Sequence, residues 1–431
     1  MANRQVLELQ SDRIEMVLAS HKAPARVTGG VVTPRAVQYH LAPAMGVKVN
    51  KVQALADELA LALGVTNVRV SRQGSSVQLE VPRDDARPVK LLPLMAQLAT
   101  SPALAAGASV PGRGDGKPSS YPQDTLKGYE RGAYAASPTP RVPLTGTPLP
   151  LFTAVLGMCD DGAPLLVRLA SPDVAHVLIS GTTGSGKTAL CQTIILSLVM
   201  THRRSQLQLV LVDPKRRAFA PFETLPHLLR PVIGDASEAV QALGELVRLM
   251  ETRGVPITPQ GYPGDKGALG VAQRGAEVTP RIIVVLDELA DLTCGANAGG
   301  KALNEHLTRL VQRGREAGIH VIACTQKPSS QVLGTLVRAN FPARLVGKVV
   351  SPEDARVAAG IGGTGAERLS GRGDFLAVAA GQVVRFQAAY VSAAEMEQVV
   401  AQMGSAPRRW DVVNGRPSLL RQAATLVAGA G

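Results

Sequence analysis

Aromatic side chains are scarce in this sequence. Phe, Trp and Tyr make up only 3% of the 431 residues, whereas hydrophobic residues of all kinds make up 45%. This composition excludes general disorder and is sufficient for a large core, which must be built from Ala, Val, Leu and Ile. The lack of aromatic rings also argues against single-stranded nucleic acid held by base stacking.

Cysteines and long apolar runs are also few. The four cysteines, Cys159, Cys191, Cys294 and Cys324, are far apart in the sequence, which excludes a CxxC metal knuckle or redox pair. So few thiols in a long chain are typical of a reducing cytosol. No apolar run reaches the roughly 18 residues that span a bilayer, and the start of the chain lacks a signal-peptide pattern. We therefore expect a soluble, cytoplasmic protein without a membrane span.

Acidic residues are outnumbered by basic ones. There are 34 Asp and Glu against 46 Lys and Arg, a formal net charge of +12. Such an excess indicates an acidic partner, and nucleic acid, an acidic membrane surface and an acidic protein all fit it.

The chain divides into four segments by composition. Residues 1–103 are predicted to form a small α+β domain, and residues 104–148 a Pro/Gly-rich linker or insertion. Residues 149–400 alternate between strand and helix patterns, which predicts an α/β domain with a doubly wound, mostly parallel sheet. Residues 401–431 are too short for a domain and are predicted to be a tail.

Local patterns predict individual elements. In the first segment we expect strands at 27–32, 36–41, 67–70 and 76–81, and helices at 52–63 and 89–99. In the third we expect strands at 175–179, 207–212, 281–286, 320–325, 344–350, 374–378 and 382–391, and helices at 187–200, 236–251 and 303–317.

A phosphate-binding motif follows the first of these later strands. Its pattern is G-x-x-x-x-G-K-[ST], and the predicted nucleotide-binding residues are Gly181, Thr182, Thr183, Gly184, Ser185, Gly186, Lys187, Thr188 and Ala189. Glycines let backbone N–H groups approach a phosphate, and the following helix contributes its positive N-terminal end. Lys187 is expected to reach the β- and γ-phosphates, and the Thr188 hydroxyl to bind Mg²⁺. The alternative is a glycine-rich turn that matches by chance.

Two adjacent carboxylates end the continuous apolar strand 281–286. Burying carboxylates at a strand end is costly unless they have a function. We expect Asp287 to hold Mg²⁺ through water and Glu288 to orient the attacking water. An adjacent glutamate also favours a nucleoside triphosphatase over a P-loop small-molecule kinase, while a solvated strand end is the alternative.

Further candidates complete this predicted ATPase site. Gln326 ends the next strand and is expected to sense the γ-phosphate or position water, although polar residues at strand ends are common. An arginine from a neighbouring subunit would stabilise the developing charge. Arg344, Arg338 and Arg315 are candidates for that role, and most arginines are simply surface residues.

The order of these motifs resembles that of the FtsK/SpoIIIE family of DNA translocases. The matching blocks in the third segment are 181–188, 213–215, 226–229, 287–291, 315–320, 325–329, 339–344 and 373–374. Blocks at 30–34, 42–49 and 55–59 resemble the domain that precedes the motor in this family.

The resemblance implies a RecA-like P-loop NTPase domain and a smaller domain, assembled as a hexameric homo-oligomer around double-stranded DNA. It makes Arg344 the first choice for the arginine supplied in trans. It also places Lys327 and Arg338 near the pore, where they would contact DNA phosphates without reading sequence. Family members usually carry membrane helices and many carry a winged-helix module, and from this sequence we expect neither.

Other functions remain open from the sequence. One is a related DNA-pumping ATPase for conjugation, plasmids or phage. Another is a P-loop ATPase that is not a motor and binds a protein partner.

Overall fold

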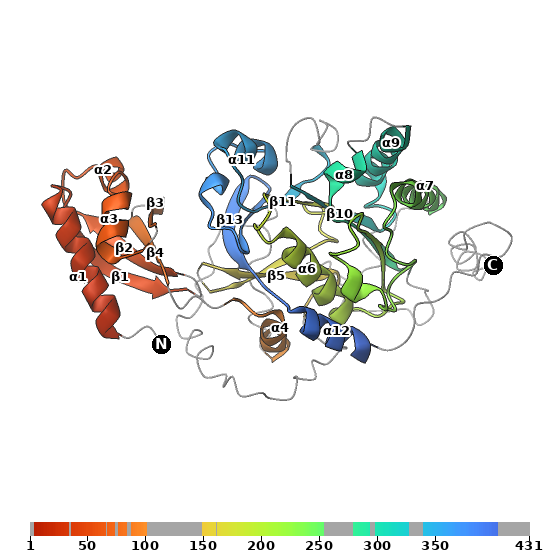
Figure 1. The fold of residues 1–431 in the computed structure, drawn as a ribbon, viewed down its shortest axis with the longest axis horizontal. Helices are drawn as coiled ribbons and strands as arrows, with labels where there is room; N and C mark the ends of the chain where they lie inside the picture. Colours follow the sequence, from red (N-terminus) through yellow and green to blue (C-terminus); the bar gives the residue numbers. More distant parts are fainter. Residues whose placement is uncertain are drawn as a thin grey trace, which may run out of the picture. The chain divides into compact units, whose positions relative to one another are not determined.

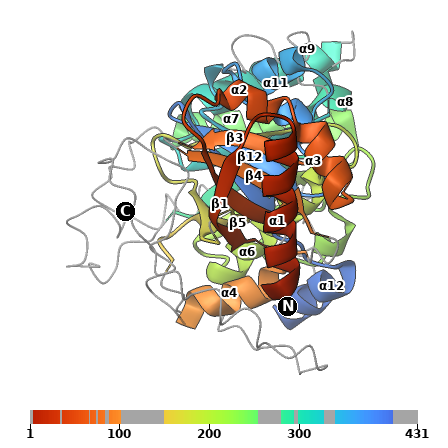
Figure 2. The same cartoon turned by 90° about the vertical axis from the view of Figure 1, so that its left-hand side faces the viewer.

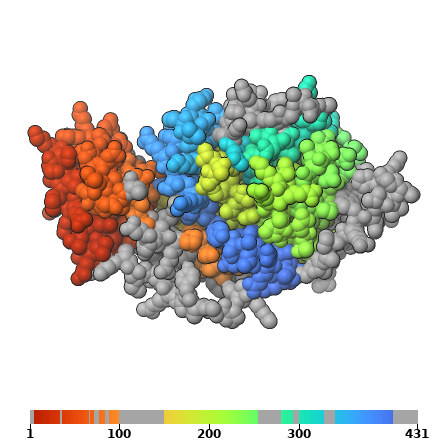
Figure 3. All heavy atoms as spheres, in the orientation of Figure 1, coloured from red at the N-terminus to blue at the C-terminus, as the bar shows by residue number. Residues whose placement is uncertain are grey.

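The computed structural model describes residues 4–33, 36–65, 67–73, 76–83, 88–100, 149–160, 162–253, 279–293, 298–326 and 339–403. They form two compact units (Figures 1 and 3). The smaller unit contains the described residues up to Val89, and the larger contains most of those from Lys90 onward. The predicted linker and all but three residues of the predicted tail lie outside the described residues.

The smaller unit is an antiparallel sheet covered by helices. Its strands have the order β1-β2-β4-β3, and their bounds are Ala25–Val32 (β1), Ala36–Pro43 (β2), Arg69–Gln73 (β3) and Ser76–Pro82 (β4). Helix α1 (Arg4–Ser20) runs across one face of this sheet (Figure 2). Its Ile14 and Leu18 pack in one buried cluster with Tyr39, Leu59 and Leu79, which ties helix and sheet into a single core.

Two differences from the sequence expectations concern helices of this unit. The expected helix 52–63 is divided into α2 (Val49–Gln53) and α3 (Ala56–Leu63). Helix α1 has no counterpart among the predictions. Its apolar stripe is obscured because Leu9 and Met16, at 59% and 67% exposure, lie on its solvent face.

The larger unit is built on a nine-stranded sheet of order β6-β5-β13-β12-β11-β7-β10-β9-β8. The strands are β5 (Thr153–Cys159), β6 (Pro164–Arg168), β7 (Val177–Ser180), β8 (Leu207–Val212), β9 (Arg281–Leu286), β10 (Ile319–Thr325), β11 (Ala343–Val346), β12 (Asp374–Ala379) and β13 (Gln382–Ala388). The pairings from β11 through β7, β10 and β9 to β8 are parallel, and the other four are antiparallel. The prediction of a mostly parallel sheet is therefore wrong for half of the pairings, and strands β5 and β6 were not predicted.

Helices cover the larger sheet. They are α4 (Leu91–Thr100), α6 (Lys187–Thr201), α7 (Ala236–Thr252), α8 (Leu289–Thr293), α9 (Ala298–Arg313), α11 (Pro352–Ala359) and α12 (Ala393–Gln402), with short 3₁₀ turns η2 (Ala220–Phe222) and η4 (Ala366–Arg368). Leu243 of α7 and Leu307 of α9 pack in one core cluster with Val284 of β9. Helix α4, expected at 89–99, contacts β5 and α6 of this unit. Among the described residues, no helix is long and apolar enough to cross a membrane.

Candidate nucleotide site

The glycine-rich motif forms the loop between β7 and α6. Its three glycines, Gly181, Gly184 and Gly186, have φ angles of +148°, +81° and +101°. These values lie in the region that favours glycine. At Gly186 a Cβ would also come within 2.8 Å of the Gly373 nitrogen, so both conformation and space require glycine there.

The Lys187 side chain folds back across this loop. Its Nζ donates to the Gly181 carbonyl at 2.7 Å and to the Thr182 carbonyl at 3.0 Å. Only 8% of the residue is exposed, and burial lowers the pKa of its ammonium group. A cation held over the N-terminal end of α6, with exposed Thr188 on the first turn, suits an anionic ligand.

Asp287 and Glu288 follow β9, whose parallel neighbours are β8 and β10. Burial raises the pKa of Asp287 to about 6, and the nearby charges of Asp213 and Glu288 add to the effect. Glu288 is only 4% exposed. The buried Asp287 carboxylate thus lies in a setting that favours binding a cation or accepting a proton, with the Glu288 carboxylate next to it in sequence.

Gln326 links the phosphate loop to the carboxylate strand. Its backbone N–H donates to the Glu288 Oε1 at 3.1 Å. Its side-chain Oε1 accepts a hydrogen bond from the Thr183 hydroxyl at 2.9 Å. The ends of β9 and β10 lie side by side because the two strands pair in parallel, and Gln326 lies within reach of both motifs.

Asp213 is a residue that the sequence analysis did not assign to the site. Its carboxylate is fully buried at the end of β8, where it accepts N–H groups from Lys215, Ala218 and Phe219 at 3.1, 2.7 and 3.2 Å. It therefore shapes the loop that follows β8 and raises the pKa of Asp287. The sequence signals were an aspartate between an apolar strand and a proline, and the family-like block 213–215 that begins with it.

Lys215 connects the same loop to the helix after Glu288. Its Nζ lies 2.9 Å from the Asp291 Oδ2, and this hydrogen bond raises the pKa of Lys215. Both side chains are about half exposed, at 52% and 44%. The pair links the loop that follows β8 to helix α8.

The candidate arginines lie in different places. Arg344 Nη1 donates to the Val357 and Ala358 carbonyls near the end of α11, at 3.3 and 3.4 Å, and its Nε to the Phe341 carbonyl. Burial lowers the pKa of His176 and of His320, and the charge of nearby Arg315 adds to the effect. Because His176 precedes β7, Arg315 lies near the N-terminal end of that strand, whereas the phosphate loop follows its C-terminal end. Lys327 and Arg338 lie outside the described residues.

A turn before β12 also contacts the phosphate loop, and the sequence analysis missed its role. The Arg372 N–H donates to the Gly184 carbonyl at 3.0 Å, and the Gly373 N–H to the Ser185 carbonyl at 2.8 Å. On the same side, the Thr182 N–H donates to the Lys348 carbonyl at 2.8 Å. The two glycines that flank Arg372 were the available signal.

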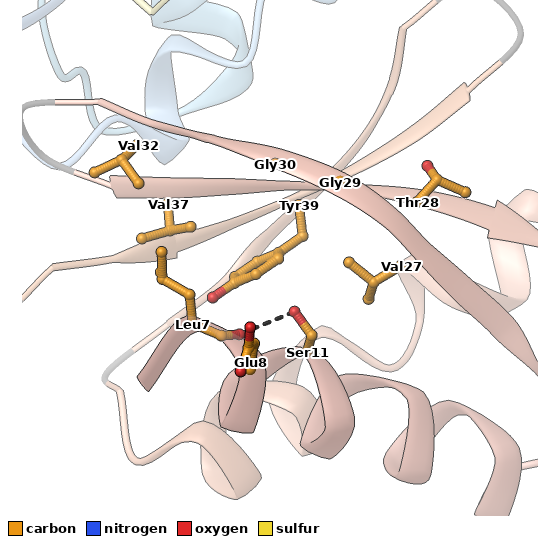
Figure 4. A pocket seen from close by; sticks show the side chains of 10 residues that line it. All are labelled: Leu7, Glu8, Ser11, Val27, Thr28, Gly29, Gly30, Val32, Val37 and Tyr39. Atoms are coloured by element: carbon orange, nitrogen blue, oxygen red, sulfur yellow. Dashed lines mark hydrogen bonds between the residues drawn. The ribbon is translucent and has the colours of Figure 1, made fainter. Parts of the chain in front are cut away.

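The smaller unit contains a separate cavity of about 290 Å³ between α1 and strands β1 and β2 (Figure 4). Its lining combines aliphatic side chains with the polar side chains of Glu8, Ser11 and Thr28, and the Tyr39 ring lies at its centre. The Tyr39 hydroxyl donates to Gln10 at 2.6 Å, and Ser11 donates to the Leu7 carbonyl. None of the predicted site residues lines this cavity.

Two family profiles match the chain. The FtsK/SpoIIIE family profile matches residues 150–262 and 266–330, and the FtsK alpha domain profile matches residues 1–83. Together they account for more than half of the chain. The match thus includes the phosphate loop, both carboxylates, Gln326 and most of the smaller unit.

Curated relatives match over nearly the whole chain. DNA translocase FtsK of Bacillus cereus is 31% identical over 410 residues, which are 92% of this chain and 45% of the relative. DNA translocase SpoIIIE of Bacillus subtilis is 31% identical over 411 residues, or 93% of this chain and 46% of the relative. The chain therefore spans about half the length of these relatives.

A solved structure shares the fold. The monomer form of the pCW3 conjugation coupling protein TcpA with ATPγS superposes with a TM-score of 0.53 and covers 92% of this chain and 100% of that chain. Its sequence identity is 16%, so this likeness concerns the fold alone.

Proposed function

The chain belongs to the FtsK/SpoIIIE family, and we propose that it is an ATP-dependent translocase of double-stranded DNA. One observation carries the catalytic part of this proposal. The loop that holds Lys187 and the strand end that holds Glu288 are joined through Gln326, by hydrogen bonds of 2.9 and 3.1 Å. A polyphosphate bound by the loop would then meet the residues that act on it.

In this proposal the substrate is Mg-ATP. The loop N–H groups and Lys187 bind the phosphates, and Thr188 and Asp287 hold the magnesium ion. The donor set fits a hard cation, which prefers hydroxyl, carboxylate and water oxygens. Asp287 must be ionised for this role, and a bound cation would offset the burial that raises its pKa to about 6.

Hydrolysis adds a water oxygen to the γ-phosphorus and breaks its bond to the bridging oxygen of ADP. Glu288 orients this water and accepts its proton, while Gln326 contacts the γ-phosphate or the water. Gln326 also couples the two, because its backbone holds Glu288 and its side chain holds Thr183. Loss of the γ-phosphate would thereby be sensed at the end of β10, immediately before Lys327.

Double-stranded DNA is the proposed polyanionic partner. The net charge of +12 supports binding to the backbone without sequence readout. Lys327 and Arg338 are the proposed phosphate contacts.

A hexamer of identical subunits is the proposed assembly, with Arg344 completing the site of a neighbour. In the chain described here the Arg344 guanidinium is bonded to three carbonyls. To reach a neighbour's site, the guanidinium would have to break its hydrogen bonds to the carbonyls of Val357 and Ala358 at the end of α11. The trans role would therefore be coupled to a change in the Arg344 rotamer.

The second candidate is an ATPase that does not move along DNA. A steady-state ATPase assay with and without linear duplex DNA, at two salt concentrations, separates the two. A translocase gives DNA-stimulated hydrolysis that weakens at higher salt, because phosphate contacts release counterions. Lys187→Ala should abolish hydrolysis, and Lys301→Ala, at an exposed position on α9, is the matched control. Normal hydrolysis by the Lys187→Ala protein would refute the site.

A further inference from the structure

The turn formed by residues 370–374 lies directly against the phosphate loop. Two consecutive N–H groups of the turn, from Arg372 and Gly373, donate to two consecutive carbonyls of the loop, on Gly184 and Ser185. The close approach of Gly186 to Gly373 leaves no room for a side chain between them. Loop and turn are thus parts of one structure.

The turn is also anchored from behind. Asp374 accepts two hydrogen bonds from the Arg385 guanidinium, both at 2.9 Å, and one from the Ser370 N–H at 2.8 Å. The Gln387 side chain donates to the Arg372 carbonyl at 3.1 Å. With these partners on both sides, the backbone at Arg372 is fixed by its surroundings.

Arg372 has an unfavourable backbone conformation. Its φ is +50°, between Gly371 at +75° and Gly373 at +91°. Glycine would adopt this conformation at less cost than a side-chain-bearing residue. The Arg372 side chain is exposed, so burial of the side chain does not offset the cost. Strain of this kind, held in place beside a binding loop, is a recognised sign of a functional residue.

The sheet order indicates which part of a nucleotide Arg372 would meet. β10 and β9, with Gln326, Asp287 and Glu288 at their ends, lie on one side of β7, whereas β11 and β12 lie on the other. The γ-phosphate belongs on the side of the carboxylates, where hydrolysis occurs. The turn before β12 therefore flanks the other end of the phosphate chain.

We propose that Arg372 is a nucleotide-binding residue that contacts the α- or β-phosphate bound in its own chain. This proposal rests on the ATPase function proposed above. A guanidinium suits the role because its planar donors pair with phosphate oxygens. The contact forms equally with ADP and ATP, so Arg372 contributes affinity and leaves the hydrolytic step unchanged.

Arg372→Gly tests this proposal, because it removes the guanidinium and relieves the backbone at the same time. Calorimetric titration of the full chain with Mg-ADP and with Mg-ATPγS should give a Kd raised about tenfold for both, the effect of losing one charge-assisted hydrogen bond. The unfolding midpoint should be equal to or above that of the wild type, so weak binding cannot be blamed on misfolding. Arg372→Lys should show an intermediate loss.

Arg216→Gly is the matched control. Arg216 is also exposed with a φ of +51°, and its side chain packs over Gly234, so the same change of charge and backbone occurs away from the loop. It should leave both Kd values within twofold of the wild type.

Three outcomes distinguish a failure of the Arg372 proposal from a failure of the proposed ATPase function. If Lys187→Ala loses nucleotide binding while Arg372→Gly binds as the wild type does, the Arg372 proposal alone fails. An unchanged Kd with a reduced kcat would also overturn it, since that places the arginine at the transferred phosphate. If the wild type binds neither nucleotide, the ATPase function itself fails.

Discussion

The Thr183 hydroxyl donates a hydrogen bond to the Gln326 side chain over 2.9 Å, across 143 residues of sequence. The backbone N–H of the same Gln326 donates a second hydrogen bond, to the Glu288 carboxylate. A change at the phosphate loop therefore reaches the proposed water-orienting carboxylate through a single residue.

Gln326→Ala should separate catalysis from binding. It removes the side chain that meets Thr183 but keeps the backbone N–H that holds Glu288. We expect kcat for ATP to fall about tenfold or more, with the Kd for Mg-ATPγS within threefold of wild type. Single-turnover hydrolysis and calorimetry check the two values, with Gln382→Ala, at an exposed position of β13, as the control. An unchanged kcat would remove Gln326 from the mechanism.

Asp213 should stabilise the fold of the larger unit. Asp213→Ala would leave three N–H groups without their acceptor, two of them in bonds that are buried, and we expect a loss of about 3 kcal/mol in the free energy of unfolding. Urea denaturation followed by circular dichroism measures it. Asp173→Ala, in the turn before β7, provides the comparison, and equal stabilities of the two variants would show that the Asp213 contacts contribute nothing.

The ion pair between Asp374 and Arg385 should contribute mainly by keeping a buried carboxylate paired. Their side chains are 4% and 16% exposed. Arg385→Met leaves Asp374 buried without its cation, and we expect a loss of about 3 kcal/mol. The double variant Asp374→Asn/Arg385→Met should recover part of that loss in the same urea experiment. If the double variant is no more stable than Arg385→Met alone, the pair does not act in this way.

The larger unit should lose stability in mild acid. Burial, and then the charge of Arg315, lower the pKa of His176 from 6.5 to about 4. Its Nδ1 must be unprotonated to accept the Val321 N–H at 3.0 Å. Between pH 6.5 and 4 the unfolded chain binds a proton at this histidine and the folded chain does not. The free energy of unfolding should therefore decrease as the pH is lowered from 6.5 to 4, by at most about 3 kcal/mol from this group.

Urea denaturation at pH 7 and pH 5 tests this dependence. His176→Asn keeps an acceptor without the titration and should reduce the difference between the two pH values. His21→Asn, at an exposed position in the smaller unit, should not change it. His320, whose pKa burial also lowers, should sustain part of the dependence in the His176 variant. A difference that is the same in His176→Asn and the wild type would contradict the assignment.

The sequence was most informative where a motif and an apolar strand coincide. β8 and β9 were predicted at their observed bounds, because runs of Leu, Ile and Val flanked by polar residues, broken in β8 by Gln208 alone, leave little ambiguity. The alternating pattern could not distinguish the parallel half of the sheet from the antiparallel half, since pairing direction depends on partners distant in sequence. Strands β5 and β6 were not predicted, and they join the sheet through antiparallel pairing of β5 with β13 and of β6 with β5.

Parts of the candidate site were beyond sequence reasoning. Lys187, Asp287, Glu288 and Gln326 were found because their neighbours in the sequence define them. The Asp213 carboxylate accepts N–H groups from the loop after β8, and the Arg372 turn contacts the phosphate loop, which is distant in sequence. The block 213–215 and the glycines that flank Arg372 marked these positions, but they did not indicate which contacts the two side chains or their backbone make.

The central claim is that ATP hydrolysis moves this chain along double-stranded DNA. Displacement of a labelled third strand from a duplex tests it most directly, since a moving motor strips the triplex without melting the duplex. We predict ATP-dependent displacement by the wild type that is absent with ATPγS and with the Lys187→Ala variant. The account would be contradicted if the wild type hydrolysed ATP at a rate independent of DNA and did not displace the third strand.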